Sequence, residues 1–103
     1  MTLGPGSAIP ALNALRAGGL DARIKLATFD LSPEVLEAVR QGRMLFAVDQ
    51  QPYLQGYLPV VMLSEEVKHG IFPAKGELIR TGPHFVTQAN ADQAMRLSAQ
   101  GIR

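Results

Sequence analysis

The sequence predicts an α/β fold, built as part of a three-layer α/β/α domain around a parallel sheet. Two short apolar runs, residues 24–29 and 44–48, are typical of buried strands. A helical segment lies between them, so the three elements form the βαβ unit of a parallel sheet. At 103 residues, the chain has room for one small domain with a modest core.

The first predicted element is a helix from Ser7 to about Ala17, with the Ser7 hydroxyl as its N-cap. Pro10 would then fall in the first turn, where a missing N–H costs little. Gly18 and Gly19 are expected to end the helix, because glycine adopts the left-handed conformation without steric cost. One face of the helix is apolar and carries Ala8, Ala11, Leu12 and Leu15.

The helix between the two strands begins with strong signals. Ser32 supplies a capping hydroxyl, Pro33 suits the first helical position, and Glu34 lies near the positive end of the helix dipole. Gly42 is expected to end this helix before the second strand.

A third helix is predicted from Pro52 to about Lys68, ended by Gly70. Pro59 inside it predicts a kink, since proline removes one backbone hydrogen bond and crowds the preceding turn. Its wide apolar face is formed by Leu54, Tyr57, Leu58, Val61 and Met62.

The last third of the chain is rich in turn residues and less regular. It holds Pro73, Gly76, Gly82 and Pro83, then a weak strand at 85–87 and a polar helix at about 90–98. A parallel sheet this small leaves open edges that invite pairing. The chain is therefore expected either to form homo-oligomers through an open edge or to share a larger sheet with further sequence.

Composition excludes several classes of function. The net charge of +1 and the scattered basic residues argue against binding to nucleic acid or an anionic membrane. The chain has no cysteine, and His69 and His84 are far apart, so no metal site, cofactor or catalytic site is predicted. The first six residues lack the basic start and apolar run of a secretory signal, so the chain as written is expected to stay in the cytoplasm.

Two polar residues follow the predicted parallel strands. Asp30 comes directly after the first strand, and Gln50 follows the second by one residue. Ligands of open α/β sheets bind beyond the carboxyl ends of the strands, and an acid with a carboxamide suits a polyhydroxylated ligand. Phe29 and Tyr53 are nearby candidates for stacking against a sugar ring. The alternative is that Asp30 caps the following loop and Gln50 caps the third helix.

Several short motifs resemble the late part of the type I periplasmic sugar-binding proteins of ABC importers, the ribose- and galactose-binding group. They are residues 27–33 (Ala-Thr-Phe-Asp-Leu-Ser-Pro), 39–44 (Val-Arg-Gln-Gly-Arg-Met) and 48–56 (Val-Asp-Gln-Gln-Pro-Tyr-Leu-Gln-Gly). Phe85-Val86-Thr87 with Asn90 is similar to the family's closing Val-Thr-x-x-Asn. The order of these motifs and the spacing of Asp30 and Gln50 agree with the family pattern.

The resemblance implies a role for each part of the chain. Residues 1–50 would belong to the second, carboxyl-terminal lobe, with Asp30 binding sugar hydroxyls. Residues 51–81 would cross the hinge and pack on the first lobe, with Gln50 binding sugar at the crossing. Residues 82–103 would cross back and end in the last helix. The implied partners are a monosaccharide (pentose or hexose) and a membrane permease, and the implied location is the periplasm.

Two departures from the family pattern qualify these expectations. Gly4-Pro5 stands where the family often has an Asn-Asp pair, so that sugar contact is lost or replaced. The chain also matches only part of the family's length, so weak or no sugar binding by the monomer is expected. Two alternatives stay open: the effector-binding portion of a LacI-type transcription regulator, and an α/β protein that only self-associates.

Overall fold

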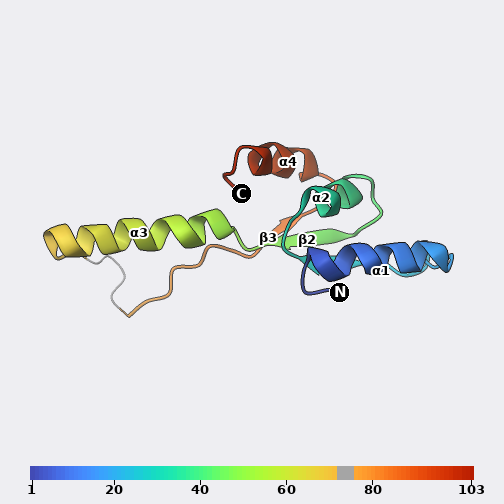
Figure 1. The fold of residues 1–103 in the computed structure, drawn as a ribbon, viewed down its shortest axis with the longest axis horizontal. Helices are drawn as coiled ribbons and strands as arrows, with labels where there is room; N and C mark the ends of the chain where they lie inside the picture. Colours follow the sequence, from blue (N-terminus) through green and yellow to red (C-terminus); the bar gives the residue numbers. More distant parts are fainter. Residues whose placement is uncertain (72–75) are drawn as a thin grey trace.

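The computed structural model describes residues 1–71 and 76–103, and Pro73 of the predicted turn-rich segment lies outside this range. Helices and strands alternate along the chain (Figure 1). Their order is α1 (Pro5–Ala17), β1 (Ala27–Phe29), α2 (Pro33–Arg40), β2 (Phe46–Asp49), α3 (Pro52–His69), β3 (His84–Val86) and α4 (Ala91–Ala99).

The three strands form one sheet in the order β1-β2-β3. β1 and β2 are parallel neighbours, with Ala27 opposite Phe46 and Phe29 opposite Val48, which confirms the predicted βαβ unit. The weak third strand is also present, but it runs antiparallel to β2. The direction follows from the connection: the chain leaves the sheet at the end of β2 and returns at the same end, where His84 pairs with Asp49.

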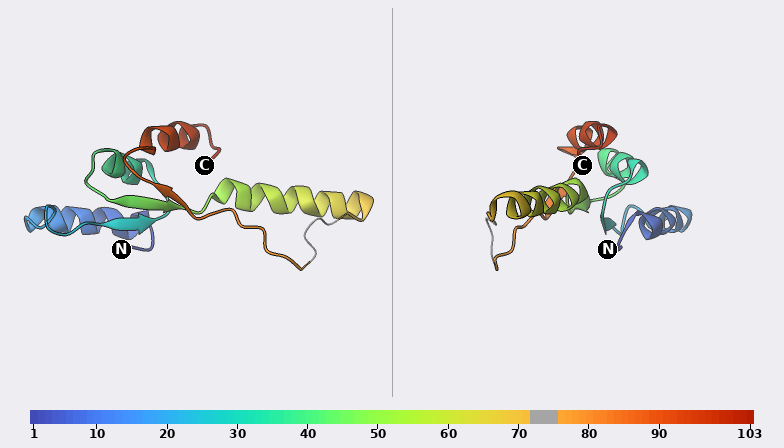
Figure 2. Two further views of the ribbon diagram at one scale, coloured as in Figure 1. Left: turned by 180° about the vertical axis from the view of Figure 1, so that it is seen from behind. Right: turned by 60° about the vertical axis from the view of Figure 1, so that its left-hand side comes forward.

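Helices α1, α2 and α4 lie in a row along one face of this sheet (Figure 2), with α2 packed against both α1 and α4. Thr28, Ala47 and Val86 are neighbours across the three strands, and all three are fully buried against the helices. Side chains alternate between the faces of a strand, so the opposite face carries Phe29, Phe46, Val48 and Phe85. The described residues thus supply two of the three predicted layers.

Helix α1 begins earlier than the sequence predicts. Gly4 is its N-cap and Pro5 is its first residue, because proline has its φ angle already set for a helix and needs no hydrogen-bond partner for its nitrogen. The Ser7 hydroxyl donates to the Gly4 carbonyl oxygen at 3.1 Å, so the prediction that Ser7 caps the helix is wrong. Pro10 accordingly lies inside the helix and not in its first turn.

Helix α2 matches its sequence signals. The Ser32 hydroxyl accepts a hydrogen bond from the Val35 amide at 3.2 Å, and Pro33 is the first helical residue. Gly42 follows the helix with a φ angle of 70°, a conformation that favours glycine. The inward side of α2 is the centre of the core, where Val35, Leu36, Ala38 and Val39 are all buried.

Both parallel strands are shorter than predicted or displaced. β1 covers only Ala27–Phe29, because the Ile24 amide bonds the Leu20 carbonyl in a turn that leaves Ile24 half exposed. β2 begins at Phe46, although Met44 before it is buried in the core.

Helix α3 and residues 76–81, together called the arm, extend away from residues 1–50 and 82–103, which are called the body (Figure 1). The radius of gyration is 17.2 Å, against about 13 Å for a compact chain of this length. No residue of α3 is buried. The helix runs through Pro59 without a sharp change of direction in Figure 1, so the predicted kink is not seen. No helix among residues 1–71 and 76–103 has both the length and the apolar character needed to cross a bilayer.

Candidate functional site

The structure brings Asp30 and Gln50 together at the carboxyl ends of β1 and β2. The Gln50 Nε2 atom donates a hydrogen bond to Asp30 Oδ1 at 2.6 Å. The Asp30 amide in turn bonds the Val48 carbonyl at 2.9 Å, which continues the parallel ladder and fixes the backbone beneath the pair. Gln50 is exposed and Asp30 half-buried, so the pair is accessible to a ligand from the end of the sheet.

Two residues at this site have an unusual backbone conformation. Asp30 has a φ angle of 60° and Gln51 one of 57°, and they are the only non-glycine residues with positive φ in the described part of the chain. This region is disfavoured for side chains with a Cβ, and it persists where the surroundings impose it. Asp30 directly follows β1, and Gln51 directly follows Gln50 beyond the end of β2, so both are at or next to the Asp30–Gln50 contact.

Contrary to the alternative interpretation, Gln50 does not cap the third helix. The N-cap of α2 is Ser32, and the N-cap of α3 is Gln51, whose side chain makes no capping hydrogen bond. Asp30 and Gln50 bond each other instead.

Asp49, the last residue of β2, is buried next to this pair. Its side chain is 1% exposed and accepts two interactions. Oδ1 accepts a hydrogen bond from the Gln51 amide at 2.8 Å, and Oδ2 forms an ion pair with the Arg103 guanidinium. Arg103 follows α4 and lies 54 positions from Asp49 in the sequence, so no local pattern predicted the contact.

The chain leaves the body after Gln50 and returns beside the same point. The Gln50 carbonyl oxygen accepts hydrogen bonds from Gln55 Nε2 at 2.9 Å and from Thr81 Oγ1 at 3.0 Å. A Cβ atom on Gly82 would lie 3.1 Å from the Asp49 carbonyl oxygen, closer than the two segments would comfortably allow. The outgoing and returning segments are therefore held side by side at the end of the sheet.

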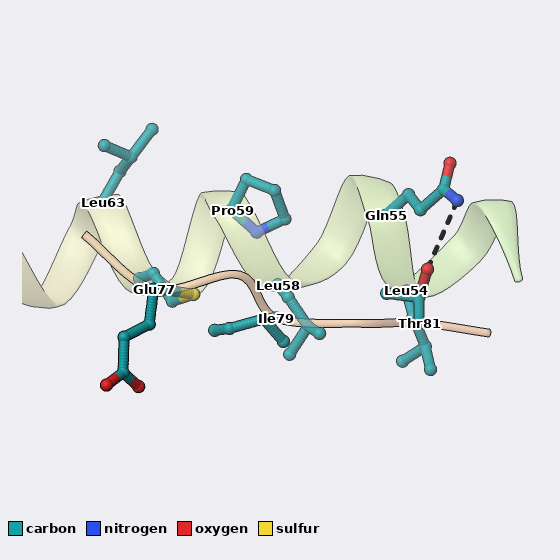
Figure 3. Close-up of a pocket in the computed structure, with 9 residues that line it drawn as sticks. Leu54, Gln55, Leu58, Pro59, Leu63, Glu77, Ile79 and Thr81 are labelled. Carbon is teal, nitrogen blue, oxygen red and sulfur yellow. Dashed lines mark hydrogen bonds between the residues drawn. The ribbon is translucent and has the colours of Figure 1, made fainter. Parts of the chain in front are cut away.

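Two hollows flank the crossing. The strand-end hollow, of about 230 Å³, is lined by Asp30, Leu31, Asp49, Pro52 and Arg103. The arm groove, of about 490 Å³, lies between α3 and the returning segment (Figure 3) and is lined mainly by apolar side chains, including Leu54, Leu58, Met62 and Ile79. Asp30, one of the two predicted sugar-binding residues, lines the strand-end hollow, and neither of the two lines the arm groove, so we take the strand-end hollow as the candidate site.

The two candidate stacking residues lie outside this hollow. Phe29 is half-buried on the sheet face opposite the helices. Tyr53 is 45% exposed, and its ring stacks on Tyr57 with centroids 5.8 Å apart and planes 9° from parallel. Their contact with a ligand stays a prediction. Within residues 1–71 and 76–103, no three metal-binding side chains lie close enough together to hold an ion.

Comparisons with known proteins point to one family. The profile of the periplasmic binding protein domain matches residues 1–70. A curated relative, the xylose/arabinose-binding protein XylF of Sulfolobus acidocaldarius, is 32% identical over 88 aligned residues, which cover 76% of this chain and 20% of that protein.

Two solved structures have the same fold. One is a carbohydrate transporter protein from Acidothermus cellulolyticus in complex with myo-inositol, with a TM-score of 0.84, 34% identity, and coverage of 98% of this chain and 35% of that one. The other is the Caulobacter myo-inositol binding protein bound to myo-inositol, with a TM-score of 0.75, 31% identity, and coverage of 94% and 32%.

The chain thus spans about a third or less of the length of these relatives. The family profile covers more than half of the chain, and the α/β architecture agrees with the solved relatives. This chain belongs to the periplasmic binding protein domain family.

Proposed function

We propose that this chain supplies one wall of the sugar-binding cleft in the solute-binding component of an ABC importer. The observation that carries the proposal is the 2.6 Å hydrogen bond between Gln50 and Asp30 at the carboxyl ends of adjacent parallel strands. The relatives support it, since they are described as binding xylose or arabinose and myo-inositol.

The chemistry of the pair fits a ring with neighbouring hydroxyl groups. Each hydroxyl both donates and accepts, while Asp30 accepts only and Gln50 does both. In the structure the two side chains are hydrogen-bonded to each other. A bound sugar replaces or shares that hydrogen bond, donating one hydroxyl to the carboxylate and accepting from the carboxamide with the next. Hydrogen bonds to an ionised group are the stronger kind, so Asp30 carries more of the affinity.

The chain's division between two lobes belongs to the same proposal. Residues 1–50 form part of the second lobe, residues 51–81 extend onto the first, and residues 82–103 return. The arm supports this division: Val60, Leu63 and Val67 of α3 are each more than half exposed, as apolar side chains are when a covering partner is missing. Closure of the two lobes over a sugar would then present the cleft to a membrane permease from the periplasmic side.

The alternative of a LacI-type regulator has less support. The named relatives are transport and binding proteins, and no feature of the described residues favours DNA over import. The relatives likewise favour binding over catalysis, so we propose a binding role without a reaction.

A titration followed by nuclear magnetic resonance tests the sugar site, because it detects the millimolar affinity expected of a single wall. Myo-inositol, xylose and arabinose are added in turn to the labelled chain, and the Gln50 side-chain amide signals are followed. We expect at least one ligand to shift these signals together with the Asp30 backbone amide.

The matched variants are Asp30→Asn and Asp21→Asn. Asparagine tolerates the left-handed conformation of Asp30, so the first variant removes the charge without straining the backbone. We expect it to weaken binding by about tenfold or more, while the same change at exposed Asp21 leaves binding unaltered. Equal effects of the two variants, or ligand shifts confined to residues away from the strand ends, would refute the site.

Self-association is a separate part of the proposal. The backbone of Thr2 bonds Ala27 and Phe29 along the outer edge of β1, so that edge is partly paired. β3 is the other edge, and its Phe85 is 51% exposed. We propose that copies of the chain pair through β3. Light scattering should give the mass of a dimer or larger species, and a monomer across the working concentration range would exclude this contact.

A further inference from the structure

The Asp49 carboxylate is buried immediately before the predicted sugar-binding residue Gln50, and the proposed function gives it no role. Its side chain is 1% exposed, and both oxygens are engaged, one by the Gln51 amide and one by Arg103. The Arg103 side chain is itself only 11% exposed. A buried carboxylate needs such partners, because an unpaired charge away from water is strongly unfavourable.

This arrangement constrains Gln50, which lies between Asp49 and Gln51 in the sequence. Asp49 is held in β2 by its pairing with His84, and its carboxylate holds the Gln51 amide across one intervening residue. Gln51 is thereby kept in the left-handed conformation. Gln50 lies between these two fixed points, so the direction of its side chain toward Asp30 follows from the backbone around it.

We propose that Asp49 and Arg103 form a hinge clamp that positions Gln50 for ligand binding. Asp49 is the positioning residue and Arg103 is its counter-ion, which ties the segment after α4 to the crossing between the lobes. The role of Gln50 in this proposal rests on the proposed function, whereas the clamp itself does not. Both residues also line the strand-end hollow with Asp30, so the clamp forms part of the wall that a ligand would face.

The test compares two arginine–carboxylate pairs in the same chain. Arg103→Gln removes the buried pair with Asp49. Arg40→Gln removes the exposed pair with Glu37, in which Arg40 Nη2 and Glu37 Oε1 are 2.6 Å apart. Two local signals are measured by nuclear magnetic resonance: hydrogen exchange of the Gln51 backbone amide, and the chemical shifts of the Gln50 side-chain amide.

Arg103→Gln should speed hydrogen exchange of the Gln51 amide by about tenfold or more relative to the amides of β2. Without its counter-ion, the Asp49 carboxylate no longer keeps the Gln51 amide hydrogen-bonded and protected from exchange. Arg103→Gln should also shift the Gln50 side-chain signals, and Arg40→Gln should change neither. Leu12→Ala is the control that separates this local effect on Gln50 and Gln51 from general destabilisation, since Leu12 is buried in the core away from the clamp. That variant should speed exchange of β2 and Gln51 together and leave the Gln50 signals in place.

Arg103→Lys is a second variant for the case that Arg103→Gln does not fold. It keeps the positive charge and loses only the planar guanidinium. We expect it to fold and to give a smaller change of the same kind. If Gln51 exchange and the Gln50 signals are unchanged in both Arg103 variants, the hinge clamp is overturned.

A sugar titration distinguishes failure of the clamp from failure of the sugar site. If the clamp positions Gln50, Arg103→Lys weakens the binding of myo-inositol or a pentose that the unmodified chain binds. If the unmodified chain binds no sugar, the proposal that this wall alone forms a measurable sugar site fails, and the exchange measurement still decides on the clamp. Normal binding by Arg103→Lys with altered Gln51 exchange would reject the positioning role while leaving the ion pair in place.

Discussion

The body and the arm both contain large apolar side chains, but these have opposite surroundings. In the body, residues such as Leu36, Met44 and Val86 are almost completely buried. In the arm, α3 has several large apolar side chains and none of its residues is buried. The structure of the body is thus stabilised by burial within this chain, whereas that of the arm depends on local backbone preferences and on the contacts at the crossing.

The difference between the body and the arm lies in how each helix is stabilised. Helix stability in proteins comes mainly from packing an apolar face, and α3 has that face without the packing. Gly56 and Pro59 lie within the helix and weaken it further. The proposed first lobe would cover the apolar face of α3, and side chains of that lobe would pack into the arm groove.

The largest expected difference is in amide hydrogen exchange. The amides of β1, β2 and α2 open only by substantial unfolding of the body, so they should exchange slowly. The amides of α3 open by local fraying, so we expect them to exchange about a hundredfold faster or more. Exchange measured by mass spectrometry or magnetic resonance gives both values in one sample. Equal protection of α3 and β2 would mean that the arm is packed in solution, by another copy or another segment.

The second largest expected difference between the body and the arm is in how leucine-to-alanine changes affect the free energy of unfolding. Leu36 is 2% exposed in the body, and Leu63 is 58% exposed in the arm. Leu36→Ala should lower the free energy of unfolding by about 2–5 kcal/mol, because it removes buried methyl groups and leaves a cavity. Leu63→Ala should change it by less than about 0.5 kcal/mol. Urea unfolding followed by circular dichroism measures both, and a large effect of Leu63→Ala would contradict the exposed arm.

The sequence predicted the parts of the fold that depend on neighbours along the chain. The βαβ unit, the Ser32 cap and the meeting of Asp30 with Gln50 all follow from local patterns and from the geometry of parallel strands. The predicted start of α1 at Ser7 is too late, because Pro5 is a favourable first helical residue.

What the sequence did not predict depends on distant parts of the chain. The antiparallel direction of β3 follows from the return of the arm to the end of β2, which no pattern within residues 84–86 encodes. The Arg103–Asp49 pair joins residues without any shared motif. Whether Phe29 or Tyr53 touches a sugar depends on the opposite wall of the cleft, so it stays a prediction.

A smaller difference in stability is expected between alanine variants of Ser32 and Ser7, the two serines that lie near helix starts. Ser32→Ala removes the hydrogen bond to the Val35 amide and should cost about 1 kcal/mol of stability. Ser7→Ala removes only an exposed contact to the Gly4 carbonyl inside α1, so its effect should be within about 0.5 kcal/mol. Thermal unfolding of the two variants compares them. A larger loss with Ser7→Ala would restore Ser7 as the cap of the first helix.

The smallest effect is a pH dependence on the exposed side of α2. Backbone hydrogen bonding at the helix start, helped by Ser32, holds the pKa of Glu34 below the 4.5 of a free side chain. The hydrogen bond from Arg40 does the same for the pKa of Glu37.

A folded-state pKa below the unfolded value means that folding favours the ionised form. This contribution is complete above about pH 4.5 and is lost as the pH falls through the lower, folded-state value. The difference in stability between the unmodified chain and Glu34→Gln or Glu37→Gln should therefore become smaller as the pH is lowered below about 4.5, as measured by urea unfolding. Arg40→Gln should reduce the pH dependence due to Glu37 and spare that due to Glu34, because only Glu37 bonds the guanidinium. If the Glu37→Gln difference instead grows on acidification, the exposed ion pair does not stabilise α2, and the helix is held by its buried face alone.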